Sequence, residues 1–183
     1  MTRPLQAMLA ICLIVCVAVG DEPAKTVKVG DKAPAFKFKD QSGKTIDLAE
    51  LFAKGPVLVR LTCGCSGCDK ELAYFQEIDA AYKKAGLTSV AIFKEADDKV
   101  AKYAADKKIN MLYGVDTKGT SWTVFDTKTM PTNILIGKGG EIIHIAPGCD
   151  TTGFLAKKVS ERIAKTLETS AVDVQKKVVE KQK

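Results

Sequence analysis

The sequence contains one histidine, His144, in 183 residues. A metal centre built on several histidines is therefore excluded, and any metal site would depend on cysteine thiolates. The chain also lacks the glycine-rich fingerprints that cradle phosphates between a strand and a helix, so no nucleotide or other organic cofactor is expected. Basic and aromatic residues are not interleaved. The formal charge of +6 therefore does not predict a nucleic-acid-binding surface.

The apolar run at the N-terminus is too short to span a membrane. It covers residues 7–19, whereas a spanning helix needs about twenty apolar residues. A positive charge precedes the run, and the small residues Ala18 and Gly20 stand three positions and one position before a cleavage point ahead of Asp21. This order is typical of a secretory signal peptide. We expect residues 1–20 to be removed and the mature protein to be exported, periplasmic or secreted, without stable membrane insertion.

The mature chain shows no internal repeat and no linker between domains. We expect a short N-terminal segment over residues 21–27, one domain over residues 28–170 and a lysine-rich helical tail over residues 171–183. A single domain of this size can form its own core. The sequence does not indicate an oligomeric state.

Hydrophobic periodicity predicts the secondary structure of the domain. The expected strands are 36–40, 45–48, 57–61, 89–93, 111–116, 132–137 and 141–146, and the expected helices are 49–54, 69–86, 97–109 and 155–167, the last prolonged toward 178. The stretch before residue 131 is expected to be irregular. Strands separated by helices pair in parallel, and the final hairpin adds an antiparallel edge. The sequence therefore predicts an α/β fold: a mixed sheet sandwiched by helices, with an N-terminal β-hairpin.

Three cysteines fall within six positions, where an expected strand leads into an expected helix: Cys63, Cys65 and Cys68. A structural disulfide here would close almost no loop and add little stability. We expect Cys65 at the helix N-terminus, where unpaired N–H groups and the helix dipole stabilise a thiolate. Cys68 follows one turn later on the same side. A thiolate with a second thiol in reach is what disulfide exchange requires.

The C-x-x-C from Cys65 to Cys68 and the pair Met130–Pro131 ahead of the strand NILI together resemble the thioredoxin superfamily. The resemblance extends over residues 27–167 and includes the entry segment of peroxiredoxins and of exported TlpA-like oxidoreductases. It implies a thioredoxin-like fold with a cis Met130–Pro131 bond and with Pro131 against the cysteines. It also implies an exported thiol–disulfide oxidoreductase in which Cys65 attacks and Cys68 resolves. The implied partners are protein thiols and disulfides, or a small thiol reductant.

A second hypothesis is a peroxiredoxin-like thiol peroxidase. Thr62 and Cys65 match part of the peroxiredoxin signature P-x-x-x-T-x-x-C, although its proline is missing. By that resemblance Thr62 and Arg60 would polarise the peroxide, even though Arg60 stands at a different place in the motif. Cys65 would then attack, and Cys68 or Cys149 would resolve the intermediate. A proline facing the cysteines suits an extended peptide or thiol better than a small peroxide, so disulfide exchange is favoured.

The sequence does not decide between several roles for Cys63 and Cys149. Cys149 lies in a loop that, by the resemblance, borders the active surface. It could resolve a Cys65 intermediate, pair with Cys63, form a structural disulfide or be inert. Cys63 alternates with Cys65 along the strand end, so its side chain is expected to point away; it could still tune the site or bond to Cys65. A third hypothesis is Cu(I) or Zn(II) binding by Cys63, Cys65 and Cys68, since copper chaperones share this fold.

The polar residues near the cluster have less defined roles. Asp69 and Glu71 follow Cys68 on the first helical turn, where they suit the helix dipole. No catalytic base is identifiable, although Glu95 is one candidate carboxylate. His144 is expected on the exposed side of an edge strand. Neither the direction of the redox reaction nor the physiological partner can be derived from the sequence.

Overall fold

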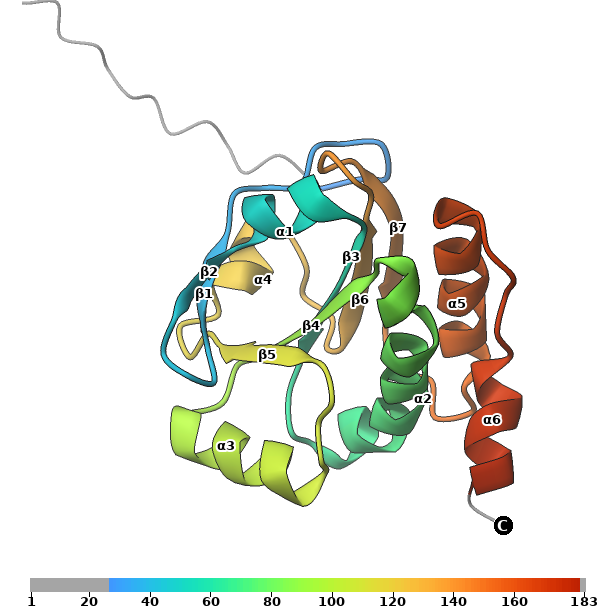
Figure 1. Ribbon diagram of the computed structural model, residues 1–183. Helices are drawn as coiled ribbons and strands as arrows, with labels where there is room; N and C mark the ends of the chain where they lie inside the picture. Colours follow the sequence, from blue (N-terminus) through green and yellow to red (C-terminus); the bar gives the residue numbers. More distant parts are fainter. Residues whose placement is uncertain (1–26, 182–183) are drawn as a thin grey trace, which may run out of the picture.

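The computed structural model describes residues 27–181 and has one mixed sheet with helices on both sides (Figure 1). The expected signal peptide, residues 1–20, lies outside the described residues. Within the described part of the chain, no helix is both long and apolar enough to cross a membrane. The division into a domain over residues 28–170 and a tail over residues 171–183 stays a prediction.

The elements follow one another much as expected. The strands are β1 Lys37–Asp40, β2 Thr45–Asp47, β3 Val57–Thr62, β4 Thr88–Phe93, β5 Leu112–Val115, β6 Thr132–Ile136 and β7 Ile142–Pro147. The α-helices are α1 Leu48–Lys54, α2 Ser66–Tyr82, α3 Asp97–Asp106, α4 Thr120–Val124, α5 Phe154–Thr166 and α6 Val174–Lys181. The sheet order is β2-β1-β5-β4-β3-β6-β7. β4 pairs in parallel with β3 and β5, and the remaining pairs are antiparallel, so the predicted mixed sheet is confirmed.

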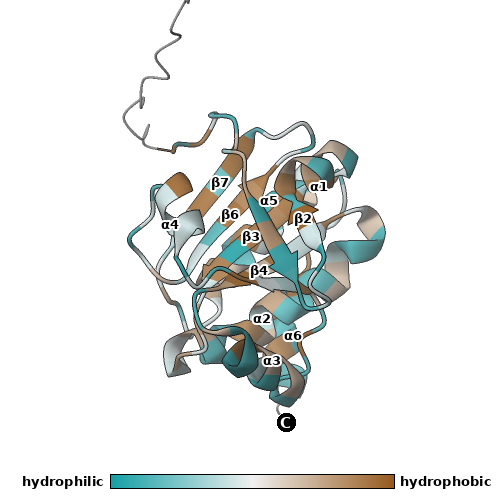
Figure 2. Ribbon diagram, turned by 90° about the vertical axis from the view of Figure 1, so that its left-hand side faces the viewer, coloured by the Kyte–Doolittle hydropathy of each residue, from teal (hydrophilic) through white to brown (hydrophobic). Residues whose placement is uncertain are grey.

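The central strands are buried on both faces because helices cover both. In β3, Leu58 packs into a core with α2, α3, α5 and α6, whereas Val57 and Val59 pack into a second core with α1 and α4. Successive side chains of a strand point to opposite faces, which explains the division. Figure 2 shows apolar segments along β3 in the middle of the sheet and along its neighbours β6 and β7 toward the edge. β3 therefore ends at a fixed place between the two layers, and the cysteines follow directly after it.

The last part of the chain differs from the expected long helix. α5 ends at Thr166, and Glu168 adopts a φ of 52°, which a continuous helix does not allow. The chain then turns back and forms the separate helix α6, with Val174 and Val178 buried. The Tyr82 hydroxyl ties these parts together, since it hydrogen-bonds to Ser160 and accepts from the Val172 N–H.

Two smaller expectations also need correction. The stretch before residue 131 is not wholly irregular, because it contains α4, a helix of 5 residues with Trp122 buried. The Asp116 carboxylate holds its start by accepting from the Ser121 N–H at 2.6 Å. His144 does lie on the edge strand β7, but it is half-buried rather than exposed, and this burial lowers its pKa.

Candidate active site

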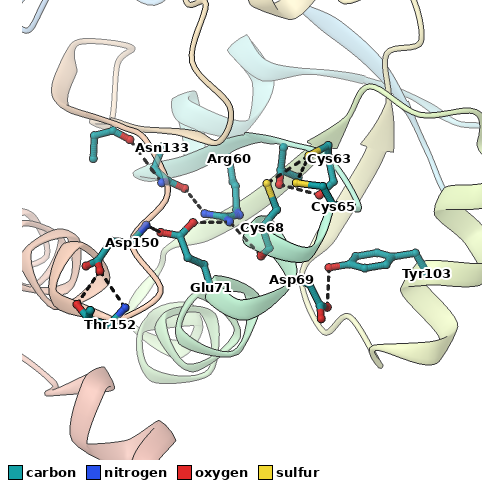
Figure 3. Close-up of polar contacts among 12 residues, drawn as sticks. Arg60, Cys63, Cys65, Cys68, Asp69, Glu71, Tyr103, Asn133, Asp150 and Thr152 are labelled. Atoms are coloured by element: carbon teal, nitrogen blue, oxygen red, sulfur yellow. Dashed lines mark hydrogen bonds and ion pairs between the residues drawn. The ribbon is translucent and has the colours of Figure 1, made fainter.

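The three clustered thiols converge between the end of β3 and the start of α2 (Figure 3). The Cys63 sulfur lies 2.8 Å from the Cys65 sulfur and 3.4 Å from the Cys68 sulfur. Cys65 is exposed, Cys63 is partly buried and Cys68 is buried. The expectation that Cys63 points away from the pair is wrong. Residues two apart in an extended chain point to the same side, and β3 ends at Thr62, so the turn that follows brings the Cys63 sulfur against the other two.

Cys65 occupies the N-cap position of α2. Its backbone is extended, with φ −74° and ψ 162°, and the chain becomes helical at Ser66. Among residues 27–181, no side chain caps this end of the helix by a hydrogen bond, so the N–H groups of the first turn remain available to a negative charge. The exposed sulfur is therefore beside the positive end of a 17-residue helix.

The proton distribution in the cluster favours a thiolate on Cys65. The hydrogen bond from the Cys63 thiol lowers the pKa of Cys65 most, and the backbone N–H groups of Cys68 and Gly67 act in the same direction. Burial raises the pKa of Cys63, and its hydrogen bond to Cys65 raises it further. Cys63 is therefore the thiol that keeps its proton and donates it toward Cys65.

A buried ion pair lies beneath the cysteines. Arg60 of β3 is 2% exposed and Glu71 of α2 is 1% exposed, and their charged groups are 2.9 Å apart. The guanidinium also donates to the Asn133 side chain at 3.0 Å and to the Cys68 carbonyl at 3.4 Å. Its plane lies over the Phe75 ring. Burying a charge is costly unless it is paired and hydrogen-bonded, and this network satisfies both requirements.

Glu71 also connects the cluster to the loop after β7. Its second carboxylate oxygen accepts from the Asp150 N–H at 2.6 Å, which fixes the segment that carries Cys149. A Cβ atom on Gly67 would lie 3.3 Å from the Cys149 sulfur, so Cys149 rests against the residue just before Cys68. The exposed Cys149 is thus on the same surface as the cluster, while burial and the Glu71 charge raise its pKa.

Pro131 lies at the same end of the sheet. The Met130–Pro131 bond is cis, as predicted. In the pairing of β3 with β6, Leu61 is opposite Thr132, which places Pro131 beside the end of β3 where Cys63 follows. The Pro131 carbonyl accepts from the Gly148 N–H at 2.8 Å.

A pocket opens on the other side of Cys65, toward α3. Its volume is about 470 Å³, and Cys65, Phe93, Glu95 and Tyr103 contribute to its wall. One Glu95 oxygen accepts from the Gly64 N–H at 3.2 Å. The other is buried and has no hydrogen-bond partner within residues 27–181. Glu95, a candidate base from the sequence, is thus close to the turn that carries Cys65.

Asp69 lies in the first turn of α2, as expected, and it also makes contacts with α3 that were not predicted. Its carboxylate accepts from the Tyr103 hydroxyl at 3.1 Å and pairs with Lys107 at 2.9 Å. Burial raises the pKa of Tyr103, and the Asp69 charge adds to this. Asp69 therefore connects the first turn of α2 to α3 in addition to its favourable position at the helix dipole.

Sequence reasoning did not find the Arg60–Glu71–Asn133 network. One signal was present, because Glu71 shares helical spacing with Phe75, Ile78 and Tyr82, all of which are buried. A carboxylate on this apolar face, together with an arginine in an otherwise apolar strand, indicates a buried ion pair. Thr62, another predicted site residue, is buried, and its hydroxyl donates to the Cys63 carbonyl at 3.3 Å.

Comparisons with known proteins agree with this architecture. The sequence matches the model of the AhpC/TSA family over residues 29–145. It is 29% identical over 149 residues to the thiol-disulfide oxidoreductase ResA of Bacillus thuringiensis subsp. konkukian. The aligned region covers 77% of this chain and 86% of that protein.

Two solved structures have a similar fold. A putative thiol:disulfide interchange protein DsbE from Chlorobium tepidum has a TM-score of 0.71 at 22% identity, over 78% of this chain and 99% of that one. Peroxidoxin BcpB from Mycobacterium tuberculosis has a TM-score of 0.64 at 23% identity, over 77% of this chain and 96% of that one. These likenesses establish the thioredoxin-like fold. The reaction has to be inferred from the geometry of the site.

Proposed function

The chain belongs to the AhpC/TSA family, and we propose that it is a thiol–disulfide oxidoreductase whose exchange centre is Cys65 and Cys68. The observation that carries the proposal is the contrast between the two thiols. Cys65 is exposed at the N-terminus of α2 with a lowered pKa, and Cys68 is buried one turn behind it. The similarity to ResA over most of the chain supports the same chemistry.

The exchange proceeds in two steps through a mixed disulfide between Cys65 and the partner. The Cys65 thiolate attacks one sulfur of the partner's disulfide, and the partner's other sulfur leaves as a thiolate. Cys68 then gives its proton to the partner thiolate released in the first step and attacks the Cys65 sulfur of the mixed disulfide. This forms the Cys65–Cys68 disulfide and releases the partner's second sulfur as a thiolate. The partner is reduced and this protein is oxidised; the reverse sequence oxidises a dithiol partner.

Pro131 is proposed to shape the surface on which the partner lies. It follows the cis bond beside the end of β3, and it has no N–H that would compete for the partner's backbone carbonyls. Partners would be protein thiols and disulfides, or a small thiol, and they would be met after export and removal of residues 1–20. Cys149, on the same surface, is proposed as an additional redox thiol.

The contacts of Arg60 and Thr62 do not favour the peroxidase alternative. The guanidinium is engaged by Glu71 and Asn133, and the Thr62 hydroxyl donates to a backbone carbonyl. Neither group is thereby directed at a peroxide beside the Cys65 sulfur. The geometry therefore supports disulfide exchange in preference to peroxide reduction.

A trapping experiment tests the proposal. Cys63 lies as close to Cys65 as a resolving thiol would, so the trap must be the double variant Cys63→Ala, Cys68→Ala. Mixed with a peptide disulfide, this variant is expected to accumulate a mixed disulfide on Cys65, identified by peptide mass spectrometry. The matched control Cys65→Ala should accumulate none. Trapping on Cys149 instead of Cys65 would overturn the assignment.

A further inference from the structure

The cluster holds one more thiol than disulfide exchange requires. An attacking and a resolving thiol are sufficient for the reaction, yet the sulfurs of Cys63, Cys65 and Cys68 all lie within 4.8 Å of one another. Cys63 is held in this position by the turn between β3 and α2, and its sulfur is directed at the other two. Three converging sulfurs are a set of metal ligands as well as a redox pair.

We propose that Cys63, Cys65 and Cys68 form a binding site for a single Cu(I) ion in the reduced protein. Soft thiolate ligands favour soft ions, among which Cu(I) is prominent. A metal about 2.3 Å from each of three sulfurs separates them by about 4 Å. The observed separations of 2.8 and 3.4 Å differ from that spacing by about 1 Å or less, which is within the reach of a side-chain rotation.

The ligand set favours Cu(I) over Zn(II). Structural zinc sites are almost always tetrahedral with four protein ligands, and within residues 27–181 the cluster comprises three. The one histidine of the chain cannot add a fourth, because His144 is level with Leu135 and Leu58 in the sheet. That position is several residues before the strand end at which the cysteines gather. Cu(I) accepts a site of three sulfurs.

The surroundings suit the charge of such a complex. Binding displaces the remaining thiol protons, and one Cu(I) with three thiolates leaves a net negative charge. Cys65 caps the N-terminus of α2, where the helix dipole favours anions. The pocket that Cys65 borders is lined by two lysines, Lys99 and Lys102, and by two carboxylates, Glu95 and Asp106, so their formal charges cancel and the helix dipole is the favourable contribution. The site is also partly shielded, since Cys68 is 2% exposed.

Copper binding and disulfide chemistry exclude each other at this site. A Cys65–Cys68 disulfide removes two of the three thiolates, so the oxidised protein has no site. A bound Cu(I) in turn occupies the sulfur that would attack a partner. The inference stands on the sulfur geometry and does not depend on the protein being an oxidoreductase.

The test is a titration of the full chain, reduced and metal-free under anaerobic conditions, with Cu(I) in competition with a chromogenic Cu(I) chelator. One Cu(I) per chain is expected, with three sulfur neighbours in X-ray absorption spectra. Cys63→Ser is expected to weaken binding by more than the roughly 10–100-fold that loss of a supporting outer contact costs. The matched control Cys149→Ser should keep the affinity of the unaltered chain.

A second measurement requires no substitution and so cannot fail through misfolding. The same chain with a Cys65–Cys68 disulfide should not compete with the chelator, and reduction should restore binding. Cu(I) affinity that is equal in the oxidised and reduced chains would overturn the proposal. So would tight Zn(II) binding that Cys149→Ser abolishes, because it would show a four-sulfur zinc site instead.

Discussion

The Cys63 thiol donates a hydrogen bond to the Cys65 sulfur across 2.8 Å. This contact is the largest cause of the lowered pKa of Cys65. Because the thiolate is the reactive form, alkylation of Cys65 in the metal-free protein should rise with pH and reach half its maximal rate below the ordinary thiol value of about 8.5. In Cys63→Ala the midpoint should shift upward. Pulsed iodoacetamide labelling with peptide mass spectrometry measures both.

Cys149→Ala is the matched control, because Cys149 makes no hydrogen bond to Cys65 within the described residues. Its Cys65 midpoint should remain near that of the unaltered protein. Identical midpoints in the unaltered chain and in Cys63→Ala would mean that the helix N-terminus alone stabilises the thiolate.

Removing one partner of the Arg60–Glu71 pair should lower the free energy of unfolding more than replacing both partners by apolar residues. Glu71→Leu leaves a buried guanidinium without its counter-charge and the Asp150 N–H without its acceptor. We expect a loss of about 3–5 kcal/mol in the free energy of unfolding. The double variant Arg60→Met, Glu71→Leu should recover much of this loss, since apolar residues of similar volume often replace a buried pair without cost. Urea denaturation of the reduced proteins measures these values.

An exposed pair provides the comparison for this experiment. Lys158 and Glu161 are 3.3 Å apart with side chains 55% and 43% exposed, and Glu161→Ala should cost no more than about 1 kcal/mol. If Glu71→Leu is as mild as Glu161→Ala, the ion pair does not have the structural importance argued above.

The Tyr82 hydroxyl should contribute to holding the C-terminal part of the chain. Tyr82→Phe leaves the Val172 N–H without its acceptor and removes the hydrogen bonds to Ser160. The expected loss is about 1–3 kcal/mol in the free energy of unfolding. Tyr113→Phe is the control, because the Tyr113 hydroxyl has no hydrogen bond within residues 27–181; its change should stay within about 0.5 kcal/mol. Equal losses would argue against the anchoring role.

His144 should make stability depend on pH below neutrality. Burial, and to a lesser degree Arg162, lowers its pKa in the folded protein, whereas the unfolded value is about 6.5. Between the two pKa values the unfolded chain binds more protons, so the free energy of unfolding falls as the pH falls through about 6.5. His144→Gln should reduce this slope between about pH 7 and pH 5. An unchanged slope would assign the dependence to other groups.

The elements that the sequence predicted well are those with local patterns. Strand alternation and helical spacing are local properties, and the C-x-x-C at the β3–α2 junction and Pro131 ahead of β6 could both be placed from them. The helix α4 escaped prediction because 5 residues are too few to show a helical period. The break between α5 and α6 depends on the backbone of Glu168, a residue that is not typical of the left-handed conformation.

Two features of the site, the environment of Glu71 and the direction of the Cys63 side chain, could be learned only from the tertiary structure. The spacing of Glu71 places it on the buried face of α2, but the partner that makes its burial possible, Arg60, reaches it from a strand rather than from its own helix. The direction of Cys63 is decided by the turn between β3 and α2, because residues 63–65 belong to neither element. Element boundaries are the least certain part of a prediction from sequence, and here the short segment between two elements determines how many thiols the site has.

The most direct test of the central claim compares two oxidants on one reduced, metal-free protein. The rates of Cys65–Cys68 disulfide formation with a peptide disulfide and with hydrogen peroxide are measured by stopped-flow fluorescence and confirmed by intact mass. We expect rapid reaction with the peptide disulfide, loss of that reaction in Cys65→Ala, and slow reaction with peroxide. Rapid oxidation by peroxide through a Cys65 sulfenic acid, with a slow response to the peptide disulfide, would contradict the proposed exchange function and make the protein a thiol peroxidase.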